Sequence, residues 1–147
     1  EIQNNLNHMS GPLLDRIDIS TEAPEITFQD LNRSTLKNES SEVILAKVMK
    51  ARKMQEIRYQ GTNIRFNADL NAGEVKEYCH LGKEETVYME QIFRQMRLSA
   101  RSYHRMLKVA RTIADLEEKE IIQSNHLAEA ASYRMTDSQY WNKVEER

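Results

Sequence analysis

Arginine is the residue type in this sequence that is best placed for chemistry on an anion. Arg16 lies in residues 10–20, SGPLLDRIDIS, at the junction of a short apolar turn and an alternating segment. A guanidinium carries a permanent charge and a fork of donors that matches carboxylates and phosphates. Arg16 therefore either pairs with Asp15 or Asp18 on the surface, or is held out to contact something outside the chain.

A second group of cations shares one helical face. At 100° per residue, Arg101, Arg105 and Lys108 lie opposite the apolar stripe of the segment that follows Ser99. Arg101 falls in the first turn, where the helix dipole favours an anion and a cation costs roughly a few tenths of a kcal/mol. The position fits an anion contact, but a solvated basic face or a DNA-binding surface would give the same pattern.

Sequence patterns typical of catalytic sites are missing. The four glycines are too scattered for a phosphate-binding loop. The histidines show no H-x-x-x-H or C-x-x-C partner spacing, and adjacent Cys79 and His80 would point in different directions on a helix. The four histidines are His8, His80, His104 and His126. By itself this chain is not expected to catalyse a reaction or to bind a metal.

Length and composition indicate a mainly helical protein of one compact domain, or of one domain and a piece of another. The chain has 147 residues, 39% apolar and 30% charged, with few glycines and prolines. A net charge of −2 gives no global basic field for non-specific binding of nucleic acid. The lone Cys79 excludes an internal disulfide and favours a reducing, cytoplasmic compartment. No membrane span or signal peptide is expected, and the start without Met indicates a piece of a longer protein.

The elements that must position these residues divide near residue 33. In residues 1–33, the pattern predicts the end of a helix over residues 1–9 and a helical turn that starts at Pro12. Ile17 and Ile19 alternate with polar residues, which predicts a short half-buried strand. This part cannot close a hydrophobic core by itself.

The apolar pattern of residues 34–147 predicts a bundle of about four to five helices that ends in a polar tail. The clearest apolar stripe follows Ser99, and Arg111 and Asp115 within it are spaced for a structural ion pair. The expected helix caps and stops are Ser99, Ser124, Gly61 and Gly82.

Long stretches of the sequence resemble a known family. SGPLLDRIDI, the block LSARSYHRMLKVARTIADLEEKEIIQSNHLAEAASYR, and NADL followed by YCHL resemble the C-terminal part of magnesium-chelatase-like AAA+ ATPases of the ComM/YifB type. The resemblance covers residues 2–134. It implies that residues 1–33 are a remnant of the ATPase core, with its last strand, and that residues 34–147 form the helical lid domain. The family's phosphate loop and its Mg²⁺-holding strand would lie upstream.

The resemblance also implies roles for two arginines. Arg16 matches an arginine finger, which reaches into the nucleotide site of a neighbouring subunit and stabilises charge on the γ-phosphoryl group. Arg101 matches the lid arginine called sensor 2, which contacts nucleotide phosphates. No family role is carried over to Arg105 or Lys108.

The implied activity is that of the full-length protein. It would be an ATP- and Mg²⁺-dependent ring, expected to be a hexamer of identical subunits, that remodels DNA by branch migration in recombination during natural transformation. The present chain alone would bind neither ATP nor Mg²⁺. Two alternatives remain, a subunit of an ATP-driven magnesium-chelatase-type complex and a stand-alone helical interaction module.

Overall fold

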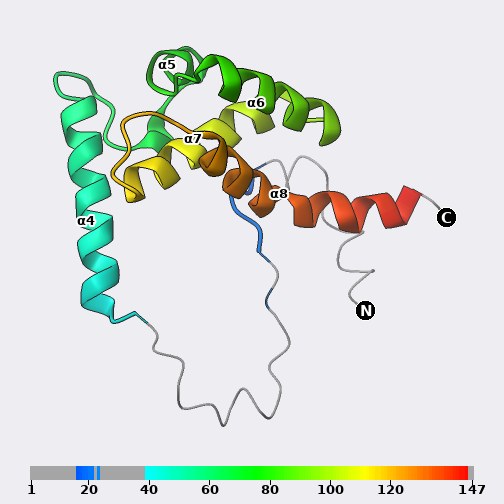
Figure 1. Cartoon of the computed structure of the whole chain (residues 1–147), viewed down its shortest axis with the longest axis horizontal. Coiled ribbons are helices and arrows are strands. Elements are labelled where there is room, and N and C mark those ends of the chain that lie inside the picture. The colour runs from blue at the N-terminus through cyan, green and yellow to red at the C-terminus, as the bar shows by residue number, and fades with distance from the viewer. Residues whose placement is uncertain (1–15, 22, 24–38, 146–147) are drawn as a thin grey trace, which may run out of the picture.

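The structure is a computed structural model that describes residues 16–21, 23 and 39–145, with side chains described up to residue 134. The predicted helix over residues 1–9, the turn at Pro12 and the boundary near residue 33 lie outside the described residues. The described part is mainly α-helical, as predicted. In chain order its elements are α4 (Ser41–Arg58), the 3₁₀ helix η1 (Asn67–Asp69), α5 (Ala72–Tyr78), α6 (Lys83–Gln95), α7 (Ala100–Leu116) and α8 (Ser124–Glu145) (Figure 1).

Helix α7 is the central element of the bundle. It packs against α4, η1, α5 and α8 (Figure 1). The predicted cap is confirmed, because the Ser99 hydroxyl accepts a hydrogen bond from the Ser102 N–H at 3.1 Å. The apolar stripe is buried as expected at Met106, Leu107, Ala110, Ile113 and Ala114.

Helix α4 is buried only in its second half. It begins after Ser40, whose hydroxyl accepts from the Val43 N–H. Every side chain from residue 41 to residue 50 is exposed, and the first turns project beyond the other helices in Figure 1. Ala51 is the first fully buried residue of this helix, although Val48, on the same face, is 41% exposed.

Residues 16–20 form a turn and a bend, so the strand predicted at Ile17 and Ile19 is wrong. Both isoleucines are exposed, and the segment is held through the Ser20 N–H, which donates to the Tyr133 carbonyl at 2.9 Å. A strand requires a neighbouring strand for its ladder of hydrogen bonds. The described part of the chain contains an isolated bridge elsewhere but no strand that could supply one.

Three predicted helix ends are placed differently by the structure. Helix α4 ends at Arg58, and Gly61 lies in the following turn with a φ of +81°, a conformation that glycine adopts without strain. Gly82 does not end α5 but precedes α6 as its N-cap residue. Ser124 is the first residue of α8 rather than its cap, since the side chain of His126 accepts the hydrogen bond from the Gln123 N–H at 2.9 Å.

Candidate functional site

Arg101 lies where a helix N-terminus is open to an anion. It is the second residue of α7 and its side chain is exposed. The first turns of α7 and α8 hold no acidic residue, whereas α4, α5 and α6 begin with glutamates that complement the helix dipole. Backbone donors and a guanidinium are therefore offered together, an arrangement that suits a phosphate.

Arg16 is also exposed, at the turn that opens the described N-terminal segment. Asp18, a predicted surface partner for it, pairs instead with Arg105 of α7, with 2.9 Å between Asp18 Oδ1 and Arg105 Nη1. The other suggested partner, Asp15, lies outside the described residues. Among the side chains that the structure describes, none forms an ion pair with Arg16.

The ion pair places the segment that contains Arg16 against the helix that contains Arg101. Asp18 follows Arg16 by two residues, and Arg105 follows Arg101 by one helical turn. The segment that carries Arg16 therefore lies against α7, with Asp18 at Arg105 and Ile19 beside a cavity that Val109 and Leu116 also line. The separation of Asp18 and Arg105 in the sequence gave no indication of this contact.

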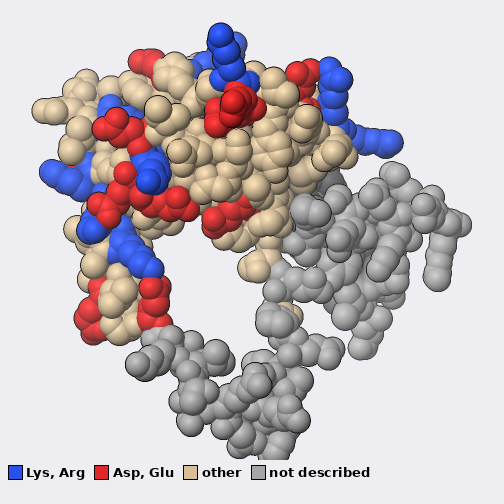
Figure 2. All heavy atoms as spheres, in the orientation of Figure 1, with Lys and Arg blue, Asp and Glu red and all other residues tan. Residues whose placement is uncertain are grey.

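The three cations on the predicted basic face of α7 differ in their contacts. Arg105 pairs with Asp18, and the Lys108 ammonium donates to the Ala68 carbonyl at 2.9 Å. Of the three cations on this face, Arg101 alone is exposed. Figure 2 shows basic and acidic side chains interspersed over α4 on the visible face. These findings weigh against a DNA-binding surface built from the three cations.

A buried polar cluster fixes α7 against α4 and η1. Asp115 is fully buried, and Arg58 donates to both of its carboxylate oxygens, at 2.9 and 2.5 Å. Arg111 Nε donates to the same carboxylate at 3.2 Å, which confirms the predicted pair. Asn67 donates to it at 2.9 Å and accepts from the Tyr59 hydroxyl at 2.6 Å. One carboxylate thereby joins three elements.

The pKa values of the two arginines in this cluster shift in opposite directions. Burial alone would lower the pKa of Arg58, but the hydrogen bond and charge of Asp115 outweigh it and raise that pKa. For Arg111 burial prevails and lowers the pKa, despite the same carboxylate. Both guanidiniums remain charged at neutral pH. Arg111 also donates to the carbonyls of Lys119 and Glu120, so it anchors the loop that follows α7.

Comparison with known proteins decides the family. Residues 38–134 match the family described as "Magnesium chelatase, subunit ChlI C-terminal". The chain belongs to this family.

Two longer curated proteins are similar to this chain over part of their length. The chain is 40% identical over 132 residues to the uncharacterized protein YifB of Escherichia coli, and 40% identical over 134 residues to the competence protein ComM of Haemophilus influenzae. These alignments cover 90% and 91% of this chain but 25% and 26% of the relatives. The magnesium chelatase C-terminal chain therefore spans about a quarter of the length of these ComM/YifB-type proteins.

Sequence reasoning missed most of the polar cluster of this magnesium chelatase C-terminal domain. Asn67 lies in the NADL stretch and Asp115 in the ARTIADL stretch, 48 positions apart. Both stretches carried the family resemblance, but a local pattern cannot show that two distant polar residues meet. The sequence around Arg58 did not indicate a buried role. An arginine in the last turn of a helix is usually explained by solvation or by its favourable interaction with the helix dipole.

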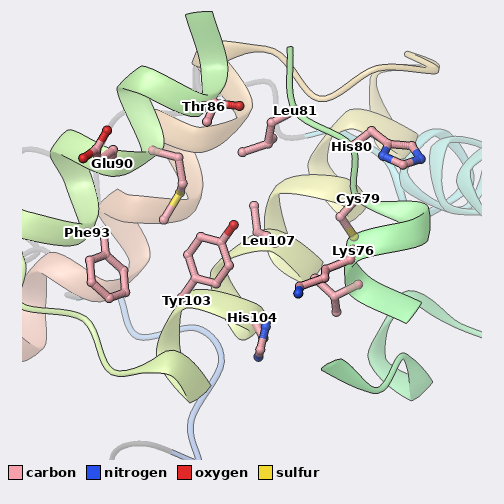
Figure 3. Close-up of a pocket in the computed structure, with 12 residues that line it drawn as sticks. Lys76, Cys79, His80, Leu81, Thr86, Glu90, Phe93, Tyr103, His104 and Leu107 are labelled. Carbon is pink, nitrogen blue, oxygen red and sulfur yellow. The ribbon is translucent and has the colours of Figure 1, made fainter. Parts of the chain in front are cut away.

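An apolar cleft of about 450 Å³ opens between α5, α6 and α7 (Figure 3). Lys76 and His80 line it and are exposed, whereas Cys79 is buried. Burial raises the pKa of the Cys79 thiol to about 11, so the group stays protonated at neutral pH. A thiolate is the reactive form of cysteine. The cleft therefore supplies apolar contact area of ligand size but no activated nucleophile.

The described residues contain neither a cluster of metal-ligand side chains nor a membrane-spanning helix. No three His, Cys, Asp or Glu side chains in this part of the chain come together as ligands for a metal ion. Among the same residues, none of the helices combines the length and apolar character needed to cross a bilayer.

Proposed function

We propose that this magnesium chelatase C-terminal domain is the nucleotide-sensing lid and arginine-finger part of an ATP-driven AAA+ motor. The observation that carries the proposal is the exposed guanidinium of Arg101 in the acid-free first turn of α7. Such a turn favours an anion, and the side chain can follow a phosphate as the lid moves. In the proposal Arg101 contacts the nucleotide phosphates of its own subunit.

Arg16 is proposed to act on the nucleotide of a neighbouring subunit. Its exposure in the turn at the start of the described segment supports a contact outside the chain. An arginine finger stabilises the charge that develops on the transferring phosphoryl group. The motor would accordingly be a ring of identical subunits, a hexamer in this proposal, that works in the cytoplasm. ATP with Mg²⁺ supplies the free energy, and the phosphate loop that holds it is proposed to lie outside this chain.

DNA is the proposed substrate of the motor. The name of the Haemophilus influenzae relative, competence protein ComM, supports this choice, since competence involves uptake of DNA. We infer branch migration of recombination intermediates as the reaction. The family description favours a second candidate, a subunit of a magnesium-chelatase-type complex. ATP turnover stimulated by branched DNA supports the first, and turnover that is indifferent to DNA supports the second.

Two substitutions in the full-length protein test the assignment of the arginines. Arg16→Ala is expected to reduce ATP turnover by about 10³-fold or more, because the transition-state charge loses its partner, while nucleotide binding is retained. Arg101→Ala is expected to weaken nucleotide binding and turnover together. Turnover is measured by phosphate release and binding by calorimetry with a non-hydrolysable ATP analogue.

Arg94→Ala serves as the control, because Arg94 is exposed and pairs only with Glu90 of its own helix in the described part of the chain. Wild-type turnover in Arg16→Ala would overturn the finger role. Unchanged binding and turnover in Arg101→Ala would overturn the sensor role. Mixing Arg16→Ala with a variant defective in the phosphate loop tests the position of the finger, since action between subunits predicts partial recovery of turnover.

A further inference from the structure

The contact between Asp18 and Arg105 has features that distinguish it from the other ion pairs of the surface. The Arg105 side chain is only 21% exposed, whereas that of Asp18 is 54% exposed. The buried Arg105 Nη1 lies 2.9 Å from Asp18 Oδ1 in a charge contact that lacks hydrogen-bond geometry. By comparison, both side chains of the Lys47–Glu39 and Arg94–Glu90 pairs are more than half exposed. Arg105 is thus held in one orientation by its surroundings, and Asp18 is the group that it meets there.

Two further contacts hold the same segment. The Ser20 N–H donates to the Tyr133 carbonyl of α8 at 2.9 Å. Ile19 forms one wall of a cavity of about 280 Å³, which Val109 and Leu116 of α7 also line. The segment therefore meets α7 through an ion pair and a shared cavity, and α8 through a backbone hydrogen bond.

We propose that Arg105 is a positioning residue that couples the two arginines, and this inference rests on the proposed function of Arg16 and Arg101. One helical turn separates Arg105 from Arg101, and two residues separate Asp18 from Arg16. The Asp115 cluster fixes α7 to α4 and η1, so these three elements move as one unit. A displacement of α7 by phosphate at Arg101 would therefore pass through Arg105 and Asp18 to the turn that holds Arg16.

The geometry of the Asp18–Arg105 pair supports a role in coupling Arg16 to Arg101 better than a role in stabilising the fold. A partly exposed ion pair contributes little to the free energy of unfolding. The same pair can still set the orientation of a short segment, together with the Ser20–Tyr133 hydrogen bond and the cavity beside Ile19. The structure thereby gives Arg105 a use that the family resemblance did not provide.

Hydrogen exchange and ATP turnover of the full-length protein test this inference together. The Ser20 amide reports docking of the segment, because it is protected by Tyr133 only when the segment lies on the helices. Asp18→Asn and Arg105→Gln are each expected to speed exchange of this amide by about 2–5-fold, the range set by a partly exposed ion pair. Arg105→Lys, which keeps the charge, is expected to retain most of the protection.

Turnover supplies the second readout. Each single substitution is expected to lower kcat for ATP by a similar factor and to leave KM nearly unchanged, because Arg101 is intact. The double variant Asp18→Asn with Arg105→Gln should be no slower than either single variant. The reversed pair, Asp18→Arg with Arg105→Asp, should recover part of both protection and kcat. Glu90→Gln, which breaks the exposed pair with Arg94, should change neither readout.

The outcomes separate this inference from the proposed function. Unchanged exchange at Ser20 in both single variants would overturn the docking contact, whatever the turnover. Faster exchange with unchanged kcat would overturn the coupling while leaving the roles of Arg16 and Arg101 to their own substitutions. Additive losses in the double variant, without recovery in the reversed pair, would mean that the two residues act separately and would also overturn the coupling.

Discussion

At the scale of single residues, Asp115 contributes to the fold through three hydrogen-bond partners, although it lies on the apolar side of its helix. Its carboxylate is fully buried and accepts from Arg58, Arg111 and Asn67. A buried charge is tolerated only when its partners are complete, since each lost partner leaves another group without compensation. The cluster therefore specifies how α7 meets α4 and η1.

Replacement of Asp115 by Asn should be strongly destabilising. Asp115→Asn keeps the shape but leaves the guanidiniums of Arg58 and Arg111 without a counter-charge. We expect a loss of about 3–5 kcal/mol in the free energy of unfolding, the range for breaking a buried ion pair. Urea denaturation of the 147-residue chain measures it. Glu90→Gln is the control, and this exposed pair should contribute less than about 1 kcal/mol. Equal small effects in both variants would contradict the role assigned to the cluster.

At the scale of elements, the two helices that form the largest contact begin in different ways. Helix α7 uses the common solution, a serine hydroxyl that accepts from the third residue on. Helix α8 uses the imidazole of His126, which is fully buried, with Nδ1 accepting from the Gln123 N–H and Nε2 lying 3.0 Å from Glu117. The second solution requires tertiary burial, so a rule based on residue type selects Ser124 wrongly.

Alanine substitutions distinguish the two serines. Ser99→Ala removes a capping hydrogen bond and should cost about 1 kcal/mol of unfolding free energy. Ser124→Ala removes a hydroxyl that caps no backbone donor and should change that free energy by less than about 0.5 kcal/mol. Thermal or urea unfolding of the two variants side by side provides the measurement. A larger loss in Ser124→Ala than in Ser99→Ala would contradict the assigned start of α8.

At the scale of the whole molecule, burial is uneven. The core lies around α7, whereas the first half of α4 leaves Val43, Leu45 and Met49 about half exposed or more. Helices gain most of their stability in proteins from packing of an apolar face. The stability of the domain therefore depends on the part centred on α7, and the ionisable groups buried there set its response to pH.

The domain should lose stability at alkaline pH. Burial raises the pKa of Cys79 from 9.0 to about 11 and that of Tyr59 from 10.0 to about 12. Between these values the unfolded chain has released protons that the folded chain retains, so the free energy of unfolding falls as pH rises. This contribution is fully present below pH 9.0 and is lost as pH approaches 12.

Urea denaturation at a series of pH values measures this loss. Cys79→Ala should flatten the part of the profile that begins near the ordinary thiol pKa, and Tyr59→Phe the part at higher pH. Each variant will also shift the whole curve, so the slope against pH is compared rather than the absolute stability. An unchanged slope in the double variant would show that other groups govern the alkaline transition.

Local chemistry was sufficient to determine some features of this protein. Helical periodicity predicted the stripe of α7, the Ser99 cap and the spacing of Arg111 and Asp115, because each depends on residues within a few positions of one another. The family resemblance was also readable from contiguous stretches such as NADL and ARTIADL, and it led to Arg16 and Arg101 as candidate site residues.

The tertiary structure decided the rest. It showed that Asp18 pairs with Arg105, that Arg58 and Asn67 complete the cluster around Asp115, and that no strand forms at residues 16–20. The ion pair and the polar cluster each depend on residues far apart in the sequence. The lack of a strand at residues 16–20 depends on the absence of a neighbouring strand among the described elements. A polar side chain is satisfied by whichever group the packing brings to it, and packing is a property of the folded chain rather than of any short stretch.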